Sequence, residues 1–144
     1  MAVTINIYDQ AIEDIVSGAI DLDSDTLKVI LLDTDASFTA TNTDLTDISG
    51  DEIANGNGYT TGGATLSNVS VTDSAGTTTV DADDVTWTAS GGNIAAFAAA
   101  IYDDTHANNR LIAFIDFGGE IIAGNGTNFN IVWNGSGILT VTTA

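Results

Sequence analysis

Two apolar runs separated by a polar loop dominate the hydrophobic pattern between residues 95 and 119. A strand turns successive side chains to opposite faces, so both faces of this hairpin are predicted to be apolar. The pattern favours a central strand pair that is covered on both sides, by a second sheet or by a neighbouring subunit. In the first arm the alternation places Phe97, Ala99 and Ile101 on one face, and Ala96, Ala98, Ala100 and Tyr102 on the other.

One helical pattern precedes the strands, over residues 8–17. Apolar residues recur there at helical spacing, and Gly18 follows at a typical stop position. Because so short a helix is marginal by itself, we expect it to pack against a sheet.

A long polar, glycine-rich connection is expected over residues 33–63. Connections of this length are uncommon in compact domains unless they are functional or contact a partner. Two interpretations of residues 33–57 stay open: an extended arm that grips a neighbour, or a surface loop with a short helical turn near residues 44–48. The glycines of residues 55–63 permit tight turns, and the Lys-Ser/Thr ending of a phosphate loop is missing, so a structural role is expected.

Short strands joined by turn residues make up the remaining pattern. About eight strands with one leading helix predict a mainly β protein: an antiparallel β-sandwich or a jelly-roll-like barrel, in a single domain over residues 1–144. The sequence contains no proline, which is a common protection of edge strands. These edges therefore need charge, twist or a partner. The strands are expected at residues 26–32, 64–72, 77–82, 85–89, in the two arms of the 95–119 hairpin, and at 128–134 and 138–143.

The charge of −18 narrows the choice of partners, because Lys28 and Arg110 are the only basic residues beside twenty acidic ones. Nucleic-acid binding depends on Lys and Arg contacts to phosphates, so no nucleic-acid partner is expected. An anionic membrane surface is an equally poor partner, and no apolar run approaches the roughly 20 residues of a membrane helix. Adaptation to a salty medium is an alternative source of the acidic bias.

The sequence contains little evidence of catalytic chemistry. We therefore expect that the protein is not an enzyme and that it has no catalytic residue and no cofactor. Without cysteine there is no disulfide and no thiolate site. His106 is the one histidine, and it lies beside Asp103 and Asp104 in a polar loop. A general base of this kind would need an orienting partner and a reacting group, and no nucleophile motif accompanies it.

An Asp-x-Asp-x-Asp run at Asp21, Asp23 and Asp25 resembles the start of a calcium loop. The rest of the EF-hand pattern fails, because Thr26 occupies the glycine position and Leu32 the terminal glutamate position. A solvated turn before a strand is the favoured interpretation, and whether calcium binds nearby stays open, so no metal site is assigned.

Sugar recognition would need exposed aromatic side chains. Five aromatic residues instead occupy strand positions where core packing accounts for most of them: Trp87, Phe97, Phe114, Phe129 and Trp133.

Six segments follow one another along the chain: IDLDSDTLKVILL, GYTTGGATLSNVSV, DADDVTWTA, AAIYDD, LIAFIDFGG and NIVWNGSGILTV. In this order they resemble a family of small tailed-phage proteins that are similar to virion structural proteins. The resemblance covers about residues 9–141. Each segment alone contains only strand and turn residues, so the resemblance depends on the six segments occurring together in this order.

The resemblance implies a mainly β virion component, and most specifically a capsid decoration (cement) protein on the capsid surface. Its expected partner is the major capsid protein, and the expected assembly is a closed symmetric homotrimer, as would occupy a three-fold position of the shell. The contacts would come from the helix at 8–17 or from residues 33–57. A phage tail, fibre or receptor-binding component is the alternative, and a carbohydrate-binding β-sandwich module is a second one.

Overall fold

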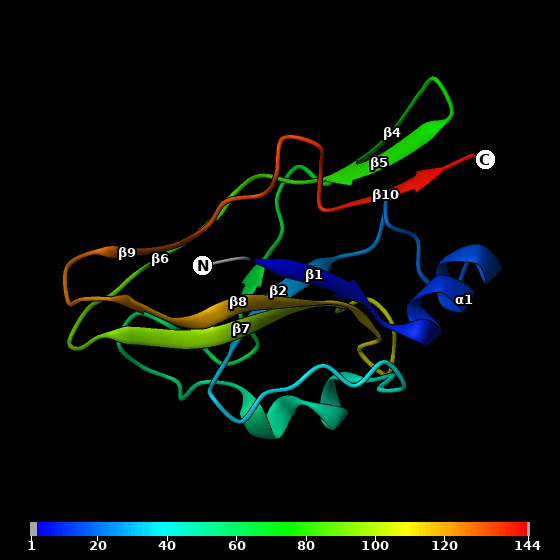
Figure 1. Cartoon of the computed structure of the whole chain (residues 1–144). Coiled ribbons are helices and arrows are strands. Elements are labelled where there is room, and N and C mark those ends of the chain that lie inside the picture. The colour runs from blue at the N-terminus through cyan, green and yellow to red at the C-terminus, as the bar shows by residue number, and fades with distance from the viewer. Residues whose placement is uncertain (1–2, 144) are drawn as a thin grey trace.

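The computed structural model describes residues 3–143, and these form a mainly β protein with one short helix near the N-terminus (Figure 1). The predicted fold class is confirmed at this level. The described residues contain ten strands in three antiparallel sheets, where about eight strands were expected, and no closed barrel.

The largest sheet has the order β1-β8-β7-β2-β3, so the predicted hairpin supplies its central strands. Strand β8 continues to Ala123, past the predicted end of the hairpin at residue 119. Strand β1 was not predicted, because four alternating residues give only a weak signal. The strands are β1 (Thr4–Ile7), β2 (Leu27–Leu32), β3 (Ala64–Thr65), β7 (Ile94–Asp103) and β8 (Leu111–Ala123).

Two smaller sheets lie over one face of this sheet (Figure 1). One has the order β10-β5-β4, and the other pairs β6 with β9. The three sheets enclose the main hydrophobic core, in which Trp87, Phe117 and Phe129 are buried. The strands are β4 (Ser70–Ser74), β5 (Thr77–Asp81), β6 (Val85–Thr88), β9 (Asn128–Ile131) and β10 (Leu139–Thr142).

Residues 64–72 were expected to form one strand, and this prediction is wrong. The segment changes sheets: β3 pairs with β2, whereas β4 pairs with β5. Asn68 lies between them with φ 52°, in the left-handed region that asparagine tolerates better than most residues. Periodicity alone cannot distinguish a bulge within one strand from a turn between two sheets.

A register shift between Ala96 and Ala98 changes the predicted faces of β7. The extra residue of a bulge reverses the alternation beyond it. Ala96 therefore shares the main core with Ala99 and Ile101, whereas Phe97 is only half-buried. The prediction that Phe97 lies on the face of Ala99 and Ile101 is wrong for this reason.

The second face of the β7–β8 pair is covered by the chain itself. Residues of the 33–63 connection pack there, with Phe38 between Tyr8 and Phe114 at ring distances of 5.2 and 6.0 Å. The connection includes two 3-10 turns, η1 (Leu45–Asp47) and η2 (Ser49–Asp51). The helical turn expected near residues 44–48 is thus confirmed, and the connection packs on its own chain.

The helix α1 (Asp9–Ser17) confirms the predicted helix to within one residue. Gly18 ends it in the left-handed region at φ 79°. The helix buries Ala11 and Asp14, but leaves Ile12 and Val16 exposed by 52 and 83%. Part of its apolar face therefore remains uncovered in the single chain.

Candidate functional site

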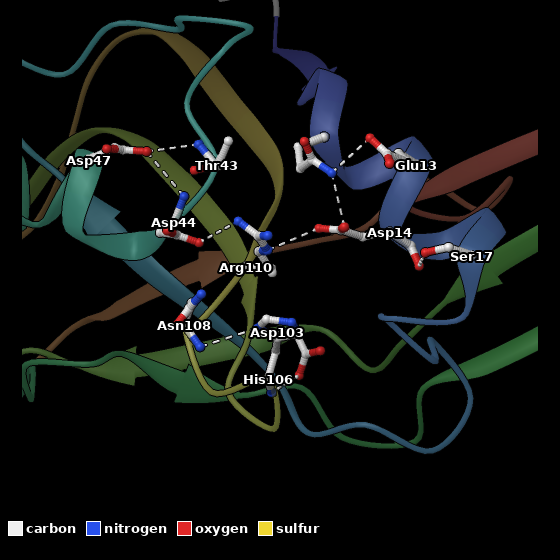
Figure 2. Close-up of polar contacts among 11 residues, drawn as sticks. Glu13, Asp14, Ser17, Thr43, Asp44, Asp47, Asp103, His106, Asn108 and Arg110 are labelled. Atoms are coloured by element: carbon white, nitrogen blue, oxygen red, sulfur yellow. Dashed lines mark hydrogen bonds and ion pairs between the residues drawn. The ribbon is translucent and has the colours of Figure 1, made fainter.

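Arg110 joins two distant segments through an acidic residue of each (Figure 2). It lies just before β8, and its Nη1 donates a hydrogen bond of 2.9 Å to Asp44 Oδ1 at the start of η1. Its Nε faces Oδ2 of the buried Asp14 of α1 at 3.2 Å, as an ion pair without hydrogen-bond alignment. This contact fixes the helix against the connection.

Lys28 is also engaged within the chain. Its Nζ lies 3.1 Å from Asp104 Oδ2, at the end of the neighbouring strand β7. Since Lys28 and Arg110 are the only lysine and arginine, neither basic side chain is free to attract an acidic partner. The molecule therefore presents a predominantly anionic surface.

His106 is not arranged as a catalytic base by its neighbours. Asp103 accepts hydrogen bonds from the backbone N–H groups of Thr105 and His106, at 2.8 and 3.2 Å, rather than from the imidazole. The imidazole Nδ1 accepts a bond of 3.2 Å from the Asn108 backbone N–H, and Asp104 pairs with Lys28. Neither acidic neighbour therefore orients the ring, which is the relationship that a His-Asp pair needs.

The Asp-x-Asp-x-Asp run forms the expected turn before β2. Asp21 Oδ1 accepts the Asp23 N–H at 3.1 Å, and Asp25 Oδ2 accepts the Asp21 N–H at 2.7 Å. Hydrogen bonds from Ser24 and Asp23 lower the pKa of Asp21. Within residues 3–143, no three or more His, Cys, Asp or Glu side chains are grouped to hold a metal ion. The three carboxylates of the run are not gathered around one point in this structure.

Aromatic side chains are used in the core rather than on the surface. Trp87, Phe114, Phe129 and Trp133 are buried, as predicted, and Phe97 is half-buried. Trp133 donates its indole N–H to the Asp83 carbonyl at 2.9 Å. These residues do not offer the exposed platform on which a sugar ring would stack.

An apolar groove of about 390 Å³ opens between the large sheet and the β6–β9 pair. Its floor contains the buried side chains of Ile115, Phe117 and Phe129. At its rim, Val3 and Val132 are exposed by 61 and 72%. The groove thus combines a buried apolar floor with apolar residues that remain in solvent, as is common at protein interaction sites.

Strand β1 borders this groove and forms an edge of the large sheet. Its sequence, Thr-Ile-Asn-Ile, contains neither a charge nor a proline. The opposite edge strand, β3, has only two residues, and β4 carries Asp73 at the edge of its own sheet. Very short length and charge protect an edge from pairing with another chain; β1 is longer than β3 and carries no charge. The sequence signal for this edge was the alternation at residues 4–7, which the strand prediction missed.

No helix within residues 3–143 has the length and apolar character needed to span a membrane. A scan against protein-family models, a search of curated proteins and a search of solved structures each found no match.

Proposed function

We propose that this chain is a bacteriophage virion structural protein, and specifically a capsid decoration (cement) protein that stabilises contacts between major capsid subunits. The supporting observation is the unprotected β1 edge beside an apolar groove. A partner strand placed there would pair with the free backbone groups of β1 and insert apolar side chains into the groove.

In this proposal the large sheet is one layer of an open β-sandwich, and the two smaller sheets are the other. The groove is the part of the core that neither layer covers. A structural subunit of this kind works by contact alone, so it requires no oriented base. The engagement of Lys28 and Arg110 within the chain also keeps positive charge away from packaged DNA.

A homotrimer is the proposed assembly state. The −18 charge opposes association at low ionic strength, because three acidic subunits repel one another. We therefore expect light scattering to report a trimer whose population grows with added salt. A monomer at high protein concentration, in both low and high salt, would contradict the trimer.

Localisation on intact particles tests the function itself. We expect cryo-electron microscopy of the phage that encodes this chain to place it on the outer capsid shell. Density in the tail or in a fibre would instead support the alternative structural role. Particles that lack the chain altogether would overturn both.

Two variants identify the contact surface. Val132→Asp places a charge at the exposed rim of the groove, whereas Val16→Asp changes an equally accessible valine on α1, at the other end of the molecule (Figure 1). Both should fold, because neither valine is buried. We expect only Val132→Asp to lose binding to capsids that lack the decoration protein. Loss with Val16→Asp alone would move the contact to the helix.

A further inference from the structure

A fully buried carboxylate at the end of β7 has only one of its two oxygens paired. Asp103 is 0% exposed, and its Oδ1 accepts the two backbone N–H groups of Thr105 and His106. Its Oδ2 is also buried and has no hydrogen-bond partner. Burying a polar oxygen without a hydrogen-bond partner costs free energy, so this atom is a candidate for binding a ligand.

The side chain of Asp25 is a close neighbour of the Asp103 side chain. The two carboxyl groups lie within hydrogen-bonding reach of each other. Their segments are held together by the Asp104 N–H, which donates to the Thr26 carbonyl at 2.8 Å, and by the Thr26 N–H, which donates to Thr105 Oγ1 at 2.7 Å. These hydrogen bonds keep the backbone of Asp25 close to that of Asp103.

Two carboxylates at this separation cannot both stay charged without a cation or a proton between them. Burial, followed by the nearby Asp25, raises the pKa of Asp103. Around the pair, Lys28 is already engaged by Asp104, and the His106 imidazole accepts from Asn108. Neither basic group neutralises Asp25 and Asp103.

We propose that Asp25 and Asp103 together bind a calcium ion at the junction between the 21–25 turn and the end of β7. Calcium accepts six to eight oxygen ligands in flexible geometry, and water and backbone carbonyls can complete a shell around two carboxylates. This assignment differs from a loop built on Asp21, Asp23 and Asp25, and it does not depend on whether the chain decorates a capsid.

Thermal unfolding in calcium chloride tests the proposal. A site with only two carboxylates is expected to bind with Kd of about 0.1–1 mM. At about 10 mM calcium, near neutral pH, such binding should raise the Tm by about 4–8 °C. Magnesium at the same concentration should raise it less, because magnesium demands a stricter octahedral geometry. Isothermal titration calorimetry should give one calcium ion per chain.

Three variants separate specific binding from screening of the acidic surface. Asp103→Asn and Asp25→Asn keep an oxygen for the backbone hydrogen bonds but remove one charge of the pair, and each should abolish the calcium response. Asp23→Asn removes an exposed charge from the same turn and should leave the response unchanged. If Asp103→Asn does not fold, the calcium response of Asp25→Asn tests the proposal, because Asp25 is only half-buried.

Three results would overturn the proposal. One is an equal calcium shift in the wild type and in Asp25→Asn, which indicates screening only. Another is an equal effect of calcium and magnesium in all variants. The third is no calcium effect on the wild type; if that wild type also gains stability on mild acidification, the pair holds a proton instead.

Discussion

The guanidinium of Arg110 faces the buried carboxylate of Asp14 at 3.2 Å, across 96 positions of sequence. Through its second contact, to Asp44, the same guanidinium joins α1 to the connection that covers the β7–β8 pair. The other basic residue, Lys28, forms a single ion pair nearer the surface. The two cations of the chain should therefore contribute very differently to stability.

Arg110→Met is expected to lower the free energy of unfolding by about 2–4 kcal/mol, because it leaves the Asp14 carboxylate buried without a counter-charge. Lys28→Met is the matched control and should cost less than about 1 kcal/mol, since that pair is partly exposed. Urea denaturation measures both. Adding Asp14→Asn to Arg110→Met should recover part of the loss, and a double variant no more stable than Arg110→Met would exclude the stranded charge as its cause.

The tight turn between β4 and β5 contains an alanine in a strained backbone conformation, so a substitution there can raise stability. Ala75 and Gly76 both have positive φ, 52 and 83°, as in a type I′ hairpin, where Asn-Gly is preferred. Ala75→Asn should raise the free energy of unfolding by about 0.5–1 kcal/mol, because alanine is strained in the left-handed region. Ala107→Asn, at an exposed position that is not among the positive-φ residues, is the control and should change little. An equal effect of both would contradict the assigned turn.

Gly63 is required where the 55–63 segment approaches β2. It has φ 73°, and a Cβ atom there would overlap the carbonyl oxygen of Val29. Gly63→Ala should therefore cost about 2–3 kcal/mol or more, from strain and displaced backbone. Gly50→Ala is the control, because a Cβ on Gly50 meets nothing within 4 Å and its φ is ordinary. Equilibrium unfolding measures the free energy of unfolding of both variants. Equal values for Gly63→Ala and Gly50→Ala would contradict the close approach of this segment to β2.

Two carboxyl groups should show opposite pH dependence. Backbone N–H groups of Thr43 and Asp44 lower the pKa of Asp47, so its stabilisation is present above about pH 4 and is lost as the pH falls through its folded pKa. Burial raises the pKa of Asp103, so its contribution is complete below about pH 4 and is lost as the pH rises through its folded pKa.

Asp47→Asn should therefore become less stable than the wild type on raising the pH, whereas Asp103→Asn should become more stable relative to the wild type. Urea unfolding from about pH 3 to about pH 8, with a chelator present to remove calcium, measures both differences. Parallel curves for the wild type and either variant would contradict the corresponding assignment.

Much of the fold was predictable because local patterns are strong in this chain. The helix ending at Gly18 and the hairpin of β7 and β8 follow from apolar periodicity and turn residues. The burial of Trp87, Phe114, Phe129 and Trp133 follows from their strand positions. Strand β1 was missed because its four residues carry little periodic signal, and the split of residues 64–72 was missed because a change of sheet leaves the local pattern unchanged.

The candidate sites depended on contacts between distant segments. Asp25 and Asp103 meet because β2 pairs with β7, and 78 positions separate them in the sequence. The groove brings β1, at the start of the chain, beside β9, near its end. Neither juxtaposition has a local signature, so a search for motifs could find only their separate parts.

The sequence by itself determined the class of structure, the acidic charge and the lack of thiol chemistry, because these depend on composition and local periodicity. Only the tertiary structure decided which layer covers each face of the central hairpin, which carboxylates meet, and that β1 lies at a sheet edge beside the groove. The physical reason is that strand pairing and bulges set the side-chain neighbours, and their energies depend on residues far apart in the chain.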